Sequence, residues 1–353
     1  MVNDVAVIGF AQSPSVPVTD GTTNGVEMLV PVFERALAQA GLPKSDVGFW
    51  CSGSSDYLAG RAFSFVAAVD AIGAFPPIHE SHIEGDAAWA LYEAWLKLRT
   101  GEADTALVYG FGKSSAGELR RVLALQTDPY TVAPLWPDAV SLAALQARLG
   151  LDAGLWSERD MAEVAARSRA DATTNPLAQL SGKVDVEELL GTEYVADPLR
   201  VHDCAPVTDG AAAVVLAAGD RARELVGRPA WISGIAHRVE SGSLGVRDLT
   251  TSVSTTASAE AAGGVDGVEV AELHAPFTHQ ELLLRQALGL GSSVRINPSG
   301  GVLTGNPMFA AGLVRIGEAA GRVFDGSAGR VLAHATSGPL LQHNLVCVLE
   351  GAR

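Results

Sequence analysis

The stretch DTALVYG, Asp104–Gly110, is the clearest indication of the fold, because a short apolar run that ends at glycine predicts a buried strand. It leads into Gly110-Phe111-Gly112. Late in the chain, the stretch GRVLAHA, Gly329–Ala335, has the same character and leads into Thr336-Ser337-Gly338. Amphipathic helical stretches alternate with such strands along the chain, which predicts a layered α/β protein. The two matching strands indicate that this α/β pattern occurs twice.

The elements around these strands follow the same order in both halves. We expect the first half to contain strands over 5–8, 106–109 and 211–217 and helices over 25–40 and 84–98. We expect the second half to contain strands over 231–235, 268–273, 331–335 and 344–349 and a long helix over 308–323. We therefore predict halves at 1–225 and 226–353. Residues from about 112 to 200 lack a counterpart and are predicted to form an inserted cap with three helical stretches.

The composition excludes some classes of function. The chain of 353 residues carries a formal net charge of −15, which argues against nucleic-acid binding. Charged residues make up only 18% of the chain and hydrophobic residues 48%, which fits a large core, a surface buried against a partner, or both.

The ends and the cysteines of the chain suggest a location. The amino-terminal residues lack the pattern of a signal peptide, and no apolar run reaches the length of a membrane-spanning helix. The three widely spaced cysteines, Cys51, Cys204 and Cys347, imply neither a disulfide framework nor a metal site. We expect a soluble cytoplasmic protein that holds no metal.

The first candidate for chemistry is His82, which we expect at the start of the helix over 84–98. There the positive end of the helix dipole would keep the imidazole neutral, as a general base requires. The alternative is that Ser81 or Asp86 caps the helix and His82 packs beside it. Local spacing favours the alternative.

The second candidate is His274, which follows the strand over 268–273 and stands on a connection where its side chain could face a cleft. The next segment, Thr278-His279-Gln280-Glu281, has the pattern of a capping box, so His279 and Glu281 are interpreted as helix-start residues. A lone histidine is more often structural than catalytic, and both interpretations stay open for His274.

The third candidate is the glycine-rich segment 297–307. Gly300 and Gly301 allow close approach of the backbone to a ligand. Asn306 before Pro307 has the pattern of an N-cap and a first helical residue, and its amide could also stabilise an oxyanion. Spacing alone does not decide between these roles.

Three motifs, taken together and in their order along the chain, resemble those of the thiolase superfamily, and the match runs over essentially the whole chain. Asn297-Pro298-Ser299-Gly300-Gly301 matches the family's NPSGG stretch, and 203–213 resembles its DGAAA turn. Residues 341–345 resemble the LQHNL segment of the sterol-carrier-protein type. The resemblance implies a duplicated five-layer αβαβα fold and a homodimer formed through the first half.

The catalytic positions depart from the family pattern. His82 stands where the family has its acyl-accepting cysteine. His274-Ala275-Pro276-Phe277 replaces HDCF, which removes the second cysteine, and Gly305-Asn306-Pro307 replaces Gly-His-Pro. The glycine-rich segment after LQHNL becomes 346–349, an apolar strand in which Cys347 is expected to be buried. Acyl-enzyme chemistry needs a nucleophile that these changes remove.

These departures make the chain similar to the cysteine-less lipid-transfer-protein branch of actinobacterial steroid degradation. That likeness implies retro-aldol cleavage of a steroidal β-hydroxyacyl-CoA to a ketone and a short acyl-CoA, with the CoA thioester as substrate and no cofactor. It further implies a small partner with an OB-fold and a zinc ribbon. In this interpretation His274 and His82 are candidate bases, Asn306 is a candidate enolate donor, and the substrate-binding candidates are His343, Ser337, Gly300 and Gly301.

The alternative function is a non-catalytic subunit that keeps the scaffold to bind an acyl-CoA or a partner chain. Loss of both cysteines favours this alternative, whereas polar residues kept at pocket positions favour an enzyme. The two differ in whether His82, His274 and Asn306 converge on one cavity.

Overall fold

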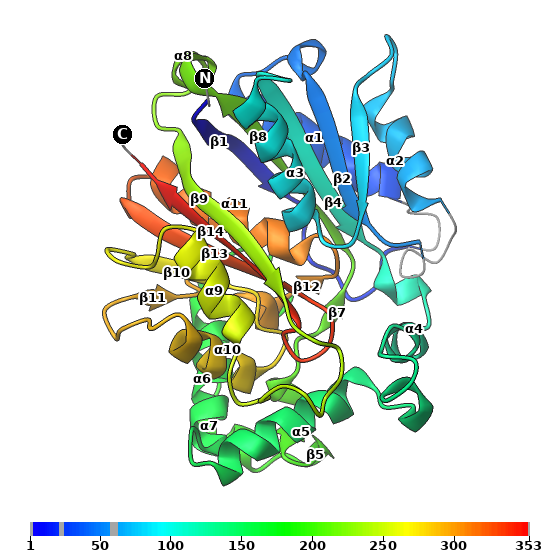
Figure 1. Cartoon of the computed structure of the whole chain (residues 1–353), viewed down its shortest axis with the longest axis vertical. Helices are drawn as coiled ribbons and strands as arrows, with labels where there is room; N and C mark the ends of the chain where they lie inside the picture. Colours follow the sequence, from blue (N-terminus) through cyan, green and yellow to red (C-terminus); the bar gives the residue numbers. More distant parts are fainter. Residues whose placement is uncertain (1–2, 21–24, 57–62, 352–353) are drawn as a thin grey trace.

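A mixed ten-stranded sheet forms the framework of the chain in the computed structural model, which describes residues 3–20, 25–56 and 63–351 (Figure 1). Its strands are β1 (Val5–Gln12), β2 (Phe49–Ser54), β3 (Glu80–Glu84), β4 (Thr105–Gly112), β8 (Gly210–Ala218), β9 (Ala230–Val239), β10 (Val270–Leu273), β11 (Arg295–Ile296), β13 (Arg330–Ser337) and β14 (His343–Glu350). Two short pairs lie outside it, β5 (Tyr194–Ala196) with β6 (Leu199–Arg200), and β7 (Val207–Thr208) with β12 (Asn306–Pro307).

The strand order repeats across the middle of this sheet. From one edge it is β3-β2-β4-β8-β1, and from the other it is β11-β10-β13-β14-β9. In each set the third, second, fourth, fifth and first strands of the half follow one another. The two sets meet at the antiparallel pair of β1 with β9, where Ala6 faces Trp231. The same five-strand unit thus occurs twice, although the residue at which the halves divide stays a prediction.

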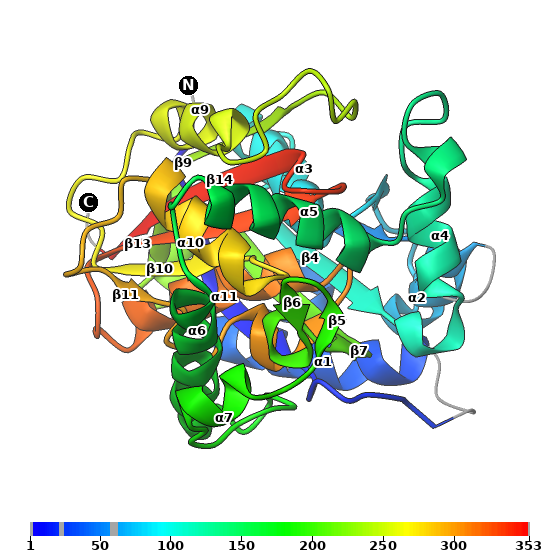
Figure 2. The same ribbon diagram turned by 90° about the horizontal axis from the view of Figure 1, so that it is seen from below.

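The helices cover the sheet in layers, as Figures 1 and 2 show. The long helices α3 (Ala87–Thr100) and α11 (Ala311–Phe324) contact each other and pack between the two halves of the sheet, which gives the central layer. On the outer faces lie α1 (Gly25–Ala40) and α2 (Ser64–Ile72) in the first half, and α9 (Val253–Ala261) and α10 (Thr278–Ala287) in the second. The expected αβαβα layering is therefore present.

The inserted cap lies between β4 and β8 at one end of the molecule (Figure 1). Within the described residues it contains four α-helices, one more than expected: α4 (Leu119–Leu125), α5 (Ala139–Asp152), α6 (Glu158–Asp171) and α7 (Val186–Leu190). A short helix, α8 (Gly219–Leu225), then precedes β9. In α6 a capping box forms, because Ser157 and Asp160 exchange hydrogen bonds with each other's backbone N–H groups.

One carboxylate caps both central helices. Oδ1 of Asp86 accepts a hydrogen bond from the backbone N–H of Ala88 in α3 (2.8 Å), and Oδ2 accepts one from Gly312 in α11 (2.9 Å). The N–H of Leu313 also points at this carboxylate. Asp86 is buried, so these bonds replace the water that would otherwise satisfy the first N–H groups of both helices.

Several predicted boundaries need correction. The helix over 25–40 is confirmed, but residues 80–84 form strand β3 and the next helix begins at Ala87. The helix predicted from residue 308 begins at Ala311, because residues 306–307 pair with β7 instead. The capping box at residue 278 is wrong, since the hydroxyl of Thr278 donates to Asp203 and α10 lacks a side-chain cap.

We expect Asp86→Ala to lower the free energy of unfolding by about 2–4 kcal/mol, because it removes one acceptor from two buried helix starts. Asp138→Ala is the matched control, since Asp138 caps α5 alone, and we expect it to cost about 1 kcal/mol. Urea denaturation measures both values. Equal losses in the two variants would contradict the double cap.

Candidate functional site

The candidate site lies where the central helices begin and where β10 and β13 end. Parallel strands in α/β proteins present functional groups at their carboxyl ends. Here β10 and β13 are parallel neighbours, and β14 returns antiparallel beside β13, so that Ser337 pairs with His343. The carboxylate of Asp86, which caps both helices, holds the starts of α3 and α11 together. These four elements therefore bring His274, Ser337 and His343 to one end of the sheet.

His274 follows β10 directly and is buried. Its Nδ1 accepts a long hydrogen bond of 3.5 Å from the backbone N–H of Thr336. Because an N–H group only donates, Nδ1 is unprotonated and the neutral ring carries its hydrogen on Nε2. Burial, with smaller effects of His334 and Arg315, lowers the pKa of His274 to about 3. At neutral pH His274 is thus an uncharged hydrogen-bond donor through Nε2.

His343 begins β14 and contacts the central helix α3. Its Nε2 lies 3.0 Å from Nε1 of Trp89 and 3.1 Å from Nδ1 of His237 at the end of β9. The backbone oxygen of His343 accepts a hydrogen bond of 3.1 Å from the hydroxyl of Thr336. Thr336 therefore bonds to both predicted site residues, to His274 through its N–H and to His343 through its hydroxyl.

Asn306 lies in β12, paired in parallel with β7, and not at the start of a helix. The predicted N-cap role is wrong, because α11 begins five residues later. The side chain is buried, and its Oδ1 has no hydrogen-bond partner among the described residues. A buried amide oxygen without a hydrogen-bond partner lowers the stability of the folded chain. This cost distinguishes Asn306 from its neighbours in this segment.

His82 does not join this group. It lies in the middle of β3, where its Nδ1 is 2.8 Å from the hydroxyl of Ser52 and its ring stacks on Phe65. The neighbouring Ile83 packs into the central core, so His82 points to the opposite, outer face of the sheet. Burial lowers the pKa of His82, while Glu84 and Asp56 oppose this effect.

The helix dipole that was expected to act on His82 is therefore absent, since the residue at the start of α3 is Asp86. None of the hydrogen bonds, ion pairs and ring contacts of His82 within residues 3–20, 25–56 and 63–351 reaches His274 or Asn306. Its catalytic role stays a prediction without a structural contact to the other candidates.

Two buried carboxylates, those of Glu272 and Glu281, accept hydrogen bonds from the NPSGG segment, 297–301. Glu272 in β10 accepts hydrogen bonds from the N–H and the hydroxyl of Ser299, at 3.1 and 2.7 Å, and pairs with Arg315 of α11 at 2.5 Å. Glu281 in α10 accepts from Nδ2 of Asn297 at 2.9 Å. Buried charges need such partners, and here both are compensated.

The inserted cap contacts the same segment. Arg167 of α6 makes two bonds of 2.7 Å to the carboxylate of Glu281, and the hydroxyl of Ser168 donates to the backbone oxygen of Gly300. Gly300 has a φ of +96°, and a Cβ there would lie 2.7 Å from the Cβ of Ala172 in the cap. The glycine is therefore required by close approach of the cap, and its predicted contact with substrate stays a prediction.

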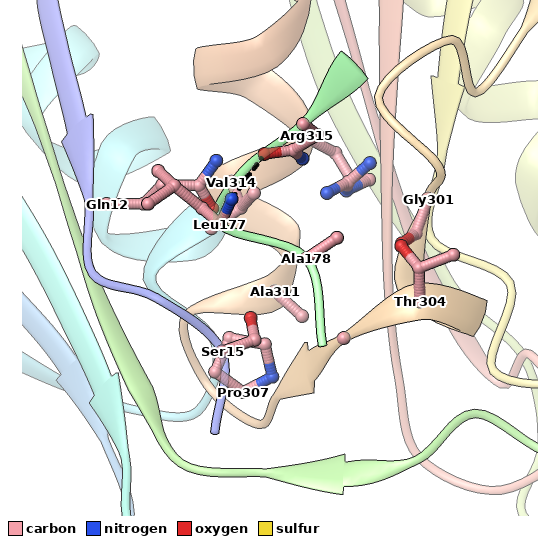
Figure 3. A pocket seen from close by; sticks show the side chains of 12 residues that line it. Gln12, Ser15, Leu177, Ala178, Gly301, Thr304, Pro307, Ala311, Val314 and Arg315 are labelled. Carbon is pink, nitrogen blue, oxygen red and sulfur yellow. Dashed lines mark hydrogen bonds between the residues drawn. The ribbon is translucent and has the colours of Figure 1, made fainter. Parts of the chain in front are cut away.

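A small pocket lies on the other side of this segment (Figure 3). Its volume is about 10 Å³, which is about what one water molecule needs. In Figure 3 the guanidinium of Arg315 points toward Gly301 and Thr304, and Pro307 lies at the opposite end; Gly305 also lines the pocket. The remaining lining residues are Gln12, Ser15, Asn175, Leu177, Ala178, Ala311 and Val314. This pocket is too small for a thioester.

The cysteines do not offer a reactive thiolate. Cys51 and Cys347 are buried in β2 and β14, as expected for Cys347, and burial raises the pKa of both thiols. Burial likewise raises the pKa of Cys204 to about 12. A thiol nucleophile needs a lowered pKa and access; none of the three has a lowered pKa, and among them Cys204 alone is partly exposed.

Sequence reasoning missed two features of the site. Asp86 could be interpreted as an N-cap, but its second helix, 226 positions away in the chain, gives no local signal. The bond from Trp89 to His343 likewise joins residues 254 positions apart.

Within the described ranges, there is no cluster of three or more potential metal ligands and no helix with the length and apolar character to cross a bilayer.

We expect Glu318→Gln to change how stability depends on pH. Burial, then the nearby charge of Glu272, raises the pKa of Glu318 to about 7 in the folded state, where its Oε1 accepts from Gln12 at 2.5 Å. The folded chain thus holds a proton that the unfolded chain releases near pH 4.5, so this residue's contribution to stability is complete below pH 4.5 and is lost as the pH rises through 7.

Urea denaturation at pH 5 and pH 8 tests this effect. The variant should lose on the order of 2 kcal/mol less stability than the wild type between the two pH values. Glu187→Gln, at an exposed position of the cap, is the control. An unchanged difference between pH 5 and pH 8 in Glu318→Gln would contradict the raised pKa.

Comparisons with known proteins agree with this fold along the whole chain. No protein-family model matches. The chain is 27% identical to an acetyl-CoA acetyltransferase of Methanothermobacter thermautotrophicus, across 90% of both chains. It is 31% identical over 212 residues to the 17-hydroxy-3-oxo-4-pregnene-20-carboxyl-CoA lyase of Mycobacterium tuberculosis, which covers 57% of this chain and 54% of the lyase.

Two solved structures share the fold. An Ltp2-ChsH2(DUF35) aldolase superposes with a TM-score of 0.80 over 99% of this chain and 98% of that chain, at 20% identity. The acetyl-CoA acetyltransferase of Bacillus anthracis gives a TM-score of 0.82 over 99% of both chains, at 16% identity. With its repeated five-strand unit and its paired central helices, the chain has the thiolase-like fold, and its sequence is similar to that of an acetyl-CoA acetyltransferase along 90% of its length.

Proposed function

We propose that this chain is a carbon–carbon lyase that cleaves a β-hydroxyacyl-CoA of a steroid side chain into a ketone and a short acyl-CoA. The observation that carries the proposal is the start of α3, where a buried carboxylate, Asp86, stands and a thiolate does not. Acyl transfer through the enzyme needs such a thiolate. Retro-aldol cleavage does not, because the substrate breaks without a covalent intermediate.

The chemistry needs donors for an oxyanion more than it needs a nucleophile. A base removes the proton of the β-hydroxyl, the bond between the α- and β-carbons breaks, and its electron pair moves into the thioester enolate. Protonation of the α-carbon then releases the short acyl-CoA. Preorganised hydrogen-bond donors that face the enolate oxygen lower this barrier. His274 through Nε2–H and Asn306 through the N–H of its Nδ2 are the groups that we assign to the enolate oxygen.

Related proteins support the substrate class. The lyase of Mycobacterium tuberculosis acts, by its name, on a steroid carboxyl-CoA, and the aldolase structure of similar fold contains a DUF35 protein. We propose a partner of that kind, with an OB-fold and a zinc ribbon, and a homodimer in addition. The low share of charged residues, 18%, supports a surface that is buried in a complex. We place the reaction in the cytoplasm.

A second candidate function is a non-catalytic subunit that binds an acyl-CoA or another chain. It is favoured by the position of His82 on the outer face of the sheet and by the water-sized pocket beside Asn306. On this proposal the polar groups near α3 stabilise the fold, and bound acyl-CoA stays intact.

Two substitutions of His274 distinguish a donor from a base. We expect His274→Ala to lower the rate of ketone release at least 100-fold, since it removes a hydrogen bond to the enolate. His274→Asn should release the ketone about tenfold faster than His274→Ala, because an amide still donates a hydrogen bond but cannot act as a base. Mass spectrometry of products from a steroidal β-hydroxyacyl-CoA, with and without the OB-fold partner, measures these rates.

The control is His279→Gln, a histidine of similar burial whose Nε2 contacts Gln146 of the cap. Thermal melting of each variant separates loss of fold from loss of activity. If His274→Asn and His274→Ala are equally inactive while both stay folded, the donor role is wrong. If wild-type protein binds the acyl-CoA but does not cleave it in any pairing, the lyase proposal fails and the subunit remains.

A further inference from the structure

Aromatic and histidine side chains from the amino-terminal part of α3 and from β9 and β14 contact one another in a cluster. Trp89 and His343 have ring centroids 4.5 Å apart, and His237 lies 5.2 Å from His343. Tyr92, one turn further along α3, packs edge-on against His237 at 4.9 Å. The proposed mechanism above does not use this cluster.

Hydrogen-bond chemistry fixes the protonation of His343. The indole Nε1–H of Trp89 can only donate, so Nε2 of His343, at 3.0 Å, must accept. Nδ1 of His237 lies 3.1 Å from the same nitrogen, but the single lone pair of Nε2 already accepts from the indole, so the bond from Trp89 decides the tautomer. A neutral imidazole has one N–H, and in His343 this N–H is therefore on Nδ1.

His343 remains neutral at physiological pH. Burial, together with the neighbouring His237, lowers the pKa of His343 to about 4. Trp89 and His237 face its ring from α3 and β9, and neither carries a negative charge that would favour the imidazolium. The ring thus offers a constant N–H donor on one side and a satisfied acceptor on the other.

One edge of the His343 ring has no partner among the described residues, and the backbone of His343 is linked to His274 through Thr336. His343 is partly exposed, and within the described residues no group is hydrogen-bonded to its Nδ1. Thr336 connects it to His274, since the hydroxyl of Thr336 donates to the oxygen of His343 and its N–H donates to His274. Two neutral histidines with fixed and opposite tautomers thus border the same residue, one presenting Nε2–H and the other Nδ1–H.

We propose that His343 donates a hydrogen bond from Nδ1 to the oxygen of the bound thioester, with Trp89 as the positioning residue that fixes its tautomer. The inference rests on the proposed function and deepens it, because it assigns a further donor for the thioester oxygen besides His274 and Asn306. An oxyanion held by neutral donors in a partly buried site is stabilised without a charged group.

Trp89→Phe tests the proposal, because it keeps an aromatic ring and removes the indole N–H. We expect kcat to fall about fivefold to tenfold with little change in KM, since the loss of one hydrogen bond frees the tautomer of His343. Trp95→Phe is the matched control on the same helix. The Nε1 of Trp95 is buried without a partner among the described residues, so its removal breaks no hydrogen bond that the structure shows.

The tautomer is read directly from the ¹⁵N chemical shifts of the histidine side chains. In the wild type and in Trp95→Phe, His343 should have a protonated Nδ1 and an unprotonated Nε2, whereas Trp89→Phe should show a mixture. A protonated Nε2 in the wild type overturns the proposal, and so does an equal effect of Trp89→Phe and Trp95→Phe on kcat.

Binding of acetyl-CoA separates this inference from the lyase proposal, because it needs no turnover. Its thioester carbonyl should shift the Nδ1 resonance of His343 in the wild type and shift it less in Trp89→Phe. If the steroidal substrate is not cleaved but this shift occurs, the lyase proposal fails and the donor role of His343 stands. If saturating acetyl-CoA leaves the resonance unchanged, His343 is not a donor to the thioester.

Discussion

The carboxylate of Asp86 is the constraint on which the centre of this structure depends. It joins the starts of two helices that come from different halves of the chain, and it does so where water is excluded. Without it, the first N–H groups of α3 and α11 would lack an acceptor. Burial raises the pKa of Asp86 to about 6, although the backbone N–H groups oppose this effect and favour the charged form. The position of α3 in turn decides where Trp89 meets His343.

The same carboxylate limits the chemistry. Paired helix amino-termini are a favourable environment for an anion, and in this chain a side chain of the protein already supplies it. The three cysteines are protonated and mostly buried, and the candidate residues His274, His343 and Asn306 offer neutral hydrogen-bonding groups. Such a site suits the stabilisation of an oxyanion that forms on a substrate, and it does not suit the formation of an acyl-enzyme.

A second set of buried charges fixes the glycine-rich segment. Glu272 and Arg315 pair below Ser299, and Glu281 joins Asn297 to Arg167 of the cap. Buried ion pairs add little net stability, because desolvation offsets the attraction, but they tolerate few alternative arrangements. Asn297, at a φ of +49°, and Gly300 are thus held in backbone conformations that an isolated loop would rarely keep. The cap is therefore part of the site's support and not a separate appendage.

The sequence by itself determined the α/β class, the two-fold repeat of strands and helices, and the histidines and asparagine worth examining. It could do so because strand and helix periodicity and turn residues are local signals. It misplaced the segment around His82, since residues 80–84 resemble a helix start locally and become a strand only by pairing with β2. The tertiary structure alone decided that His82 faces outward, that Asp86 caps two helices, and which nitrogen of His343 carries the hydrogen. Each of these depends on partners distant in sequence, which no local pattern records.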